Sequence, residues 1–259
     1  MSKKRSIATE KSNARRAAER AAAIRKEQEA KERRRRTLTV TVVVLVVLTV
    51  LLGIGYAVQS SRDTTGQVAT PPDGVVEKYA FPFGDPTAPV KVAVYEDFMC
   101  PFCGQFEAVS KDMLERYVDQ GDVEVRYHVI SFLDGSSNTD YSTRAANAAG
   151  VVLDTTGPEA AKKFHDLLYA NQPEEGSDGL SDDQLIEFAV EAGAQESDVR
   201  QPIEDLKFEQ WVKNATEESS KQDVATTPTV MVDGESVDFE TLDDLLASTT
   251  DAIESALNN

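Results

Sequence analysis

The sequence has 259 residues, of which 41% are hydrophobic, and carries a formal net charge of −18. This length allows one substantial globular domain with additional segments, or two small domains. The chain contains two cysteines, Cys100 and Cys103. Two cysteines exclude a four-cysteine zinc site and a small scaffold held together by several disulfides.

Charge is distributed unevenly along the chain. Residues 1–36 carry 14 Lys/Arg and 5 Asp/Glu, a net charge of +9, whereas the remaining residues carry 13 and 40, a net charge of −27. A basic tail followed by an acidic remainder predicts that the two parts face different environments.

An apolar run of 22 residues follows the tail, from Thr37 to Val58, without charge or proline. About 20 apolar residues suffice for a helix to cross the hydrocarbon core of a bilayer, so we predict a single transmembrane helix over 37–58. A buried core helix and the apolar part of a cleaved signal peptide are the alternatives. The run exceeds the usual signal core of about 7 to 15 residues, and no small-residue cleavage site follows it closely.

Four arginines, Arg33 to Arg36, directly precede this run, whereas its other end begins with uncharged residues. The positive charge predicts a cytoplasmic tail at 1–36, a single-pass anchor in the plasma membrane and an extracytoplasmic remainder. Residues 59–75 are rich in Ser, Thr, Gly and Pro and are expected to form a linker. The folded domain is expected at 76–257.

The first elements of that domain are a strand and a helix. The segment 89–95 alternates valines in the manner of a strand and continues directly into Cys100. From Pro101 the apolar residues recur every three to four positions until Gly121, which predicts a helix. Proline suits the first helical turn, where its missing N–H costs nothing.

A second strand is predicted at 123–132, followed by four helices within 140–222. The sequence then returns to a strand at 229–232, with Asp233 and Gly234 as a hairpin turn before a short strand at 236–239. A last helix is predicted at 242–257. The chain is therefore expected to have an α/β fold.

The pair Cys100 and Cys103 carries the chemistry that the sequence predicts. Two intervening residues let the sulfurs form a small disulfide ring, and the helix N-terminus places free N–H groups near the first sulfur. Such a position lowers a cysteine pKa from about 8.5 to between roughly 3.5 and 7.5. Cys100 is therefore expected to be the attacking sulfur, and Cys103 its shielded partner.

A metal site shared between chains and an inert structural disulfide are the competing interpretations of this pair. Zinc would need two further ligands, and neither His128 nor His165 has a recognisable ligand spacing to the cysteines. No metal site is expected, and both histidines are interpreted as ordinary structural or surface residues. No cofactor is expected beyond the redox-active disulfide.

The run APVKVAVYEDFMCPFCGQFE, the later ATTPTVMVDG and the helical block between them resemble the DsbA-like branch of the thioredoxin-fold proteins. The resemblance covers about residues 76–257. It implies a thioredoxin fold with an inserted helical domain at about 138–222, which helps to form a groove for unfolded substrates.

The resemblance also implies a second part of the active site. Pro228 would form a cis-proline loop beside the disulfide, and the backbone of Thr227 would pair with an incoming peptide. Pro101 and Phe102 would join Thr227 in substrate binding. A proline that only marks the start of a strand is the alternative.

The sequence departs from the family pattern at two positions. Phe102 stands where strongly oxidising members have histidine, so stabilisation of the Cys100 thiolate relies more on the helix end and the backbone. Val94 stands six residues before Cys100, where many thioredoxin-fold proteins have a buried acid. Glu96 and Asp97 are nearby acids that could serve in proton transfer; exposed loop charges and helix-end anions are the alternatives.

These observations predict an extracytoplasmic thiol-disulfide oxidoreductase that donates its disulfide to reduced secreted or cell-envelope proteins, where disulfides persist. The resemblance implies reoxidation by a quinone-linked membrane protein of the DsbB or vitamin K epoxide reductase type. No nucleic-acid partner is expected. A disulfide isomerase or reductase on the same fold, and a membrane-tethered peptide-binding or chaperone module, are the alternatives.

Overall fold

The computed structural model describes residues 68–258. The predicted tail at 1–36 and the predicted transmembrane helix at 37–58 lie outside this part of the chain. Among the helices within 68–258, none combines the length and the apolar character needed to cross a membrane.

Five strands form one mixed sheet in the order β1-β3-β2-β4-β5. The strands are β1 (Phe81–Phe83), β2 (Val90–Glu96), β3 (Val123–Val129), β4 (Thr229–Val232) and β5 (Glu235–Ser236). β2 and β3 run parallel, with Val90 opposite Val123, and the other neighbours pair antiparallel. Because β2 lies at the centre of the sheet, the residues that follow it emerge in the middle of the sheet edge.

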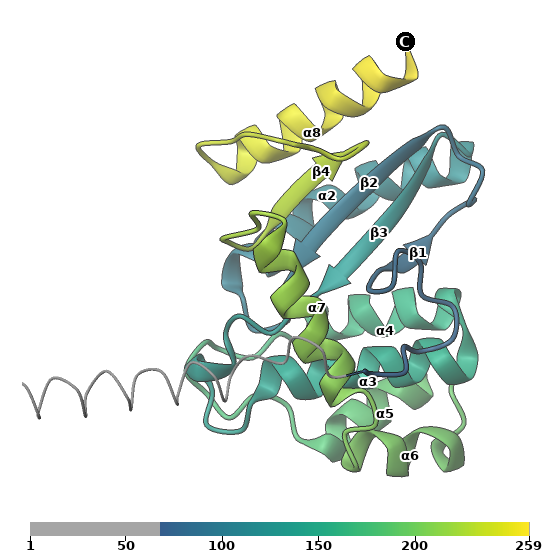
Figure 1. Ribbon diagram of the computed structural model, residues 1–259, viewed down its shortest axis with the longest axis vertical. Coiled ribbons are helices and arrows are strands. Elements are labelled where there is room, and N and C mark those ends of the chain that lie inside the picture. Colours follow the sequence, from purple (N-terminus) through teal and green to yellow (C-terminus); the bar gives the residue numbers. More distant parts are fainter. Residues whose placement is uncertain (1–67, 259) are drawn as a thin grey trace, which may run out of the picture. The chain divides into compact units, whose positions relative to one another are not determined.

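Two helices cover one face of this sheet, α2 (Pro101–Gln120) and α8 (Leu242–Leu257) (Figure 1). The alternation predicted for β2 explains the packing, because Val90, Val92 and Val94 are all buried on the same face of the strand. The structure confirms the predicted bounds of α8, and α2 ends at Gly121 in a left-handed conformation, as its glycine predicts.

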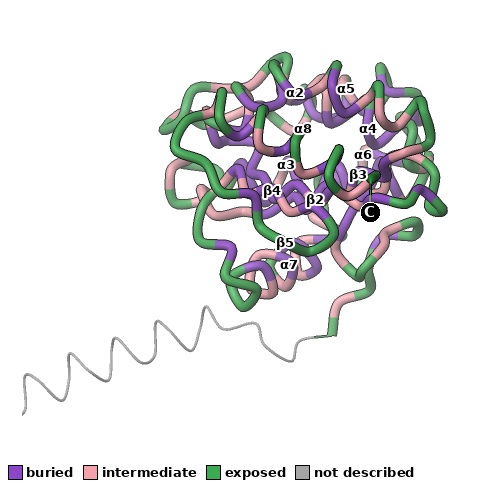
Figure 2. The backbone as a smooth tube through the Cα atoms, turned by 90° about the horizontal axis from the view of Figure 1, so that it is seen from above, coloured by how far each residue is buried: buried purple, intermediate pink, exposed green. Residues whose placement is uncertain are grey.

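A block of five helices lies between β3 and β4, as the predicted insertion at 138–222 requires (Figure 1). The helices are α3 (Tyr141–Thr156), α4 (Pro158–Ala170), α5 (Asp182–Ala192), α6 (Glu196–Glu204) and α7 (Glu209–Lys221). The middle of α3 is buried without interruption from Ala145 to Leu153, which places it in the interior of the block (Figure 2). Leu168, Phe208 and Trp211 are buried as well, whereas Leu167 and Phe188 are only partly buried.

The prediction of four helices in this block was wrong by one, because no turn signal separates α6 from α7 in the amino-acid sequence. Leu206 adopts a left-handed conformation there, with φ at 51°, although it is not a glycine. The buried side chain of Asn147 fixes this break. Its Nδ2 donates to the Ile203 carbonyl at 3.3 Å, and its Oδ1 accepts the Phe208 N–H at 2.7 Å.

The start of the packed unit and the last hairpin also differ from the prediction. Pro72 is buried and the Asp73 N–H donates to Asp154 Oδ1 at 2.9 Å, so the end of the predicted linker packs against α3. β1 was not predicted. The Asp233–Gly234 turn forms as expected, with φ values of 49° and 86°, but β5 is shorter than the predicted strand at 236–239.

Candidate active site

Cys100 lies at the junction that the sequence predicts. β2 ends at Glu96, and Cys100 is the residue that precedes the first turn of α2, in an extended conformation with φ at −72° and ψ at 116°. Pro101 occupies the first helical turn, so it removes no hydrogen bond that α2 would need. The free N–H groups of the helix N-terminus therefore lie around the first sulfur.

The two cysteines occupy different environments. Cys100 is 4% exposed and Cys103 is fully buried, and both are free thiols in this structure. Hydrogen bonding from Cys103, from the Thr227 side chain and from the N–H groups of Phe102 and Cys103 lowers the pKa of Cys100 to about 6 despite its burial. Burial raises the pKa of Cys103 well above its usual value, as does the neighbouring Cys100.

The Thr227–Pro228 loop completes this arrangement. The peptide bond between them is cis, as the resemblance implied, and Pro228 is buried immediately before β4. The Cys100 thiol donates a hydrogen bond to the Thr227 carbonyl oxygen at 3.4 Å. The structure thus brings together residues that are 127 positions apart in the sequence.

The remaining predicted substrate contacts differ in exposure. The side chain of Phe102 is 59% exposed, which is uncommon for a phenyl ring, whereas Pro101 is partly buried. An exposed aromatic ring next to the reactive thiol offers apolar contact to an approaching peptide. The role of both residues in substrate binding stays a prediction.

Asp97 is buried, which excludes the interpretation that it is an exposed loop charge. Its Oδ1 accepts hydrogen bonds from the Met99 N–H at 2.8 Å and the Ser142 hydroxyl at 2.6 Å. Its Oδ2 accepts the Leu133 N–H at 2.9 Å. Asp97 therefore ties the active-site loop to the loop after β3 and to α3, and both of its oxygens are engaged.

Glu96 is also buried, and its partner comes from the helical insertion. Its Oε1 lies 2.5 Å from Nε2 of His165 in α4, while its Oε2 has no hydrogen-bond partner. Burial lowers the pKa of His165, but the charge of Glu96 and hydrogen bonds to Asp166 and Glu96 outweigh burial and raise that pKa to about 10. His165 is therefore the charged partner of Glu96.

Glu107 is the third member of this buried group. It lies four residues after Cys103 in α2, so the two side chains share a helix face. Burial, with the neighbouring charge of Glu96, raises the pKa of Glu107 to about 7. Among residues 68–258, Glu96, Glu107 and His165 lie close enough together to offer ligands to a metal ion, but the pairing of His165 with Glu96 already satisfies the imidazole.

Sequence reasoning missed His165, Glu107 and Gln172 as neighbours of the active site. The spacing between Cys103 and Glu107 was a usable signal, because residues four apart meet on one helix face. No local pattern marks His165 or Gln172, since their place beside the catalytic loop depends on how α4 packs against the sheet.

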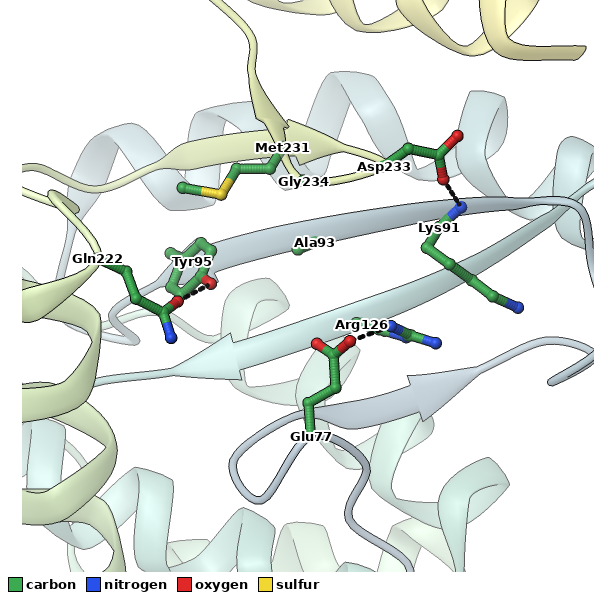
Figure 3. A pocket seen from close by; sticks show the side chains of 9 residues that line it. All are labelled: Glu77, Lys91, Ala93, Tyr95, Arg126, Gln222, Met231, Asp233 and Gly234. Carbon is green, nitrogen blue, oxygen red and sulfur yellow. Dashed lines mark hydrogen bonds and ion pairs between the residues drawn. The ribbon is translucent and has the colours of Figure 1, made fainter. Parts of the chain in front are cut away.

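A hollow on the face of the sheet opposite α2 and α8 contains none of the predicted site residues. It has a volume of about 560 Å³ and lies over the β2 side chains Lys91, Ala93 and Tyr95 (Figure 3). Its charges are already engaged, since Arg126 pairs with Glu77 and with Glu124. Chemistry is therefore expected at the cysteines and not in this hollow.

The family model described as Thioredoxin matches residues 77–251, which is more than half of the chain. This chain belongs to the thioredoxin family. Its fold is therefore a thioredoxin fold with an inserted helical domain, as the motif around Cys100 and the Thr227–Pro228 loop implied.

Two solved structures from Mycobacterium tuberculosis are similar to the chain over nearly their whole length. Reduced DsbA is 31% identical with a TM-score of 0.55, and the similarity covers 71% of this chain and 95% of that protein. The reduced disulfide bond oxidoreductase DsbG is 32% identical with a TM-score of 0.55, covering 76% and 98%. The chain is thus a thiol-disulfide oxidoreductase of the DsbA type.

A curated relative matches over a shorter region. The serine/threonine-protein kinase PknE of Mycobacterium tuberculosis is 30% identical over 116 residues, which cover 43% of this chain and 20% of the kinase. The chain therefore matches about one fifth of the length of that relative.

Proposed function

We propose that this thiol-disulfide oxidoreductase is an extracytoplasmic oxidase, which passes its Cys100–Cys103 disulfide to reduced secreted or cell-envelope proteins. The observation that carries the proposal is the lowered pKa of Cys100, about 6 beside the helix N-terminus. A stable thiolate favours the reduced enzyme, so the disulfide is given up readily. The pKa of Cys100 lies between those of the attacking cysteines of thioredoxin, about 7, and of DsbA, about 3.5.

The reaction begins when a substrate thiolate attacks the Cys100 sulfur of the oxidised enzyme. The Cys100–Cys103 bond breaks, Cys103 leaves with the electron pair and takes up a proton, and a mixed disulfide joins Cys100 to the substrate. A second substrate thiolate then attacks the substrate sulfur of this bond. Cys100 leaves as a thiolate, so the substrate has lost two electrons and the enzyme has gained them.

Glu96 is the better placed of the two acids for relaying that proton from its charged partner His165. Both oxygens of Asp97 accept hydrogen bonds, whereas Oε2 of Glu96 is free of partners and buried. The charge of Glu96 also contributes to the raised pKa of Cys103, which indicates that the two groups interact.

Substrate binding is assigned to the surface around Cys100. The backbone of Thr227 precedes strand β4 and is proposed to pair with an extended peptide, and Phe102 and Pro101 are proposed to contact its side chains. Main-chain pairing gives affinity without demanding one sequence. Such binding suits an enzyme that meets many unfolded proteins.

The proposed location rests on the N-terminal sequence. The apolar run at 37–58 and the arginines before it support a membrane anchor with the catalytic domain outside the cytoplasm. A quinone-linked membrane protein of the DsbB or vitamin K epoxide reductase type is the proposed reoxidant. An anchor would keep enzyme and reoxidant in one membrane and raise their effective concentration.

A disulfide isomerase or reductase is the second candidate, because the pKa of Cys100, about 6, is nearer to that of thioredoxin than to that of DsbA. Equilibrating the purified full-length protein with glutathione buffers separates the two directions. A reduction potential towards about −120 mV supports the oxidase, and one near −270 mV contradicts it.

Activity is tested with a reduced, unfolded protein whose native disulfides restore its own enzymatic activity. The oxidised chain should transfer one disulfide per molecule, and Cys100→Ala should abolish this transfer. Cys103→Ala should instead trap mixed disulfides at Cys100, which also identifies the substrates. Equal binding and protection of unfolded protein by wild type and Cys100→Ala, without disulfide transfer, would favour the chaperone alternative.

A further inference from the structure

One side of α4 and the residues directly after it contact the segment that carries Cys100. His165 reaches Glu96 through the 2.5 Å contact described above. Tyr169, one turn later, packs its ring against that of Phe98, with 5.2 Å between the ring centroids. Gln172 is one further turn along, where its N–H still bonds to the Tyr169 carbonyl at 3.3 Å.

Gln172 makes the most direct of these contacts. Its Nε2 donates one hydrogen bond to the Phe98 carbonyl oxygen at 3.1 Å and another to the Cys100 carbonyl oxygen at 2.8 Å. One side-chain amide therefore bridges the two ends of the turn that leads from β2 into α2. The amide has two N–H groups, so it can make both bonds at once.

Gly104 leaves room for this side chain. A Cβ atom added at Gly104 would lie 2.2 Å from Oε1 of Gln172, which is closer than such atoms approach. Gly104 also follows Cys103 directly, and its N–H donates to the same Cys100 carbonyl at 3.2 Å. A side chain at position 104 would therefore displace the Gln172 side chain from its contacts.

We propose that Gln172 is a positioning residue of the active site, through which the helical insertion holds the Phe98–Cys100 turn so that the Cys100 sulfur faces the helix N-terminus. This inference rests on the proposed role of Cys100 as the attacking sulfur. Gln172 does not touch the sulfur, and it acts through the backbone of the turn.

The physical reason is the dependence of thiolate stability on geometry. The Cys100 sulfur is stabilised by the N–H groups of Phe102 and Cys103 and by the Thr227 side chain. Hydrogen bonds weaken steeply when their distance or angle changes. A turn that has lost its two bonds to Gln172 would hold the sulfur less firmly against these donors, and the thiol would be favoured over the thiolate.

The test compares Gln172→Ala with Asn171→Ala in the full-length chain. Asn171 is an exposed neighbour whose side chain bonds only locally, to the Leu167 carbonyl at 2.9 Å. Gln172→Ala is expected to raise the pKa of Cys100 by about half to one unit, and to stabilise the disulfide against glutathione about threefold to tenfold, the effect of one hydrogen bond. Asn171→Ala should change neither quantity.

A double-mutant cycle with Gly104→Ala makes the test specific. Alanine is favoured over glycine inside a helix, so this change should not weaken α2 itself. It should displace the Gln172 side chain and reproduce the effect of Gln172→Ala, and the double variant should be no worse than either single one. Additive effects of the two changes would overturn the proposal.

The thiolate absorbance at 240 nm reports the pKa of Cys100 whether or not the protein oxidises substrates. An unchanged pKa and glutathione equilibrium in Gln172→Ala would show that Gln172 serves stability alone, and would overturn the inference. A wild-type protein that transfers no disulfide would contradict the proposed function. The pKa of Cys100 could still be measured in that case, so the test of Gln172 would remain possible. If Gln172→Ala does not fold, Gly104→Ala provides the same comparison.

Discussion

The Cys100 sulfur lies 3.4 Å from the carbonyl oxygen of Thr227. This contact joins the start of α2 to the loop before β4, and these two segments lie 127 residues apart in the sequence. The reactive thiol therefore faces the backbone on which an extended peptide is proposed to pair. Binding of the peptide and attack on the disulfide would take place at one point of the structure.

The Thr227 hydroxyl is expected to contribute to the acidity of Cys100. The Thr227 side chain lowers the pKa of that thiol through a hydrogen bond. Thr227→Val keeps the shape of the side chain and removes the hydroxyl, so the pKa of Cys100 should rise by about half a unit. Thr227→Ser keeps the hydroxyl and should leave the pKa near its wild-type value. The rate of alkylation against pH measures both variants, and equal shifts in the two would contradict the prediction.

The reduced wild-type protein should gain stability with pH relative to Cys100→Ser. The pKa of Cys100 is lowered in the folded state from 9.0 to about 6. A depressed pKa stabilises the fold above the unfolded value, and this contribution is lost as the pH falls through the folded value. The advantage of the reduced form over Cys100→Ser should therefore grow between pH 6 and 9.

Urea unfolding of both proteins at pH 5, 7 and 9 under reducing conditions provides the measurement. Cys103 is present in both proteins, so the stability that its raised pKa removes towards pH 9 is common to both and cancels in their difference. A constant stability difference between the two proteins from pH 5 to 9 would contradict the lowered pKa.

The segment around Cys100 and Cys103 could be predicted because the sequence patterns that indicate its structure are local. The cysteine spacing, Pro101 at the first helical turn and the alternating valines of β2 lie within one short segment, and their structures depend on neighbours in sequence. The Asp233–Gly234 turn and the bounds of α8 were predicted for the same reason.

The supporting residues could not be predicted, because their roles come from packing between distant segments. Asn147 ends α6 from a helix about 60 residues earlier, and His165 pairs with a carboxylate 69 positions away. Glu96 and Asp97 are adjacent in sequence, yet Glu96 pairs with His165 in α4, whereas Asp97 accepts hydrogen bonds from loop N–H groups and from Ser142 in α3. Only the arrangement of α3 and α4 against the sheet distinguishes them.

Asp97 is expected to stabilise the folded state. Replacement by alanine leaves the N–H groups of Met99 and Leu133 and the Ser142 hydroxyl without their acceptor. Each buried donor left unpaired costs about 1 to 3 kcal/mol, and part of this is offset because a buried carboxylate is no longer desolvated. Asp97→Ala should lower the free energy of unfolding by about 2 to 4 kcal/mol in urea titrations.

Ser142→Ala is the matched control for that variant. It removes one of the three donors and leaves the two backbone bonds in place, so a loss of about 1 kcal/mol is expected. A stability of Asp97→Ala equal to that of Ser142→Ala would show that the backbone bonds to Asp97 contribute little.

His128 should make the folded domain sensitive to acid. It is buried in β3, stacks on Tyr95 with 4.2 Å between the ring centroids, and has a pKa lowered to about 4 by burial and by Arg126. An unfolded histidine has a pKa of about 6.5, so the unfolded state binds the proton first and stability falls as the pH drops from 6.5 towards 4. The loss should reach about 2 to 3 kcal/mol by pH 4.5.

His128→Phe tests this prediction, because a phenyl ring keeps the stacking on Tyr95 and cannot be protonated. The variant should lose less stability than the wild type between pH 7 and 4.5, by about 2 to 3 kcal/mol in urea unfolding. Parallel pH profiles for the two proteins would show that His128 has the same pKa in the folded and unfolded states. That result would contradict its burial as the cause, because desolvation is what keeps the imidazole neutral.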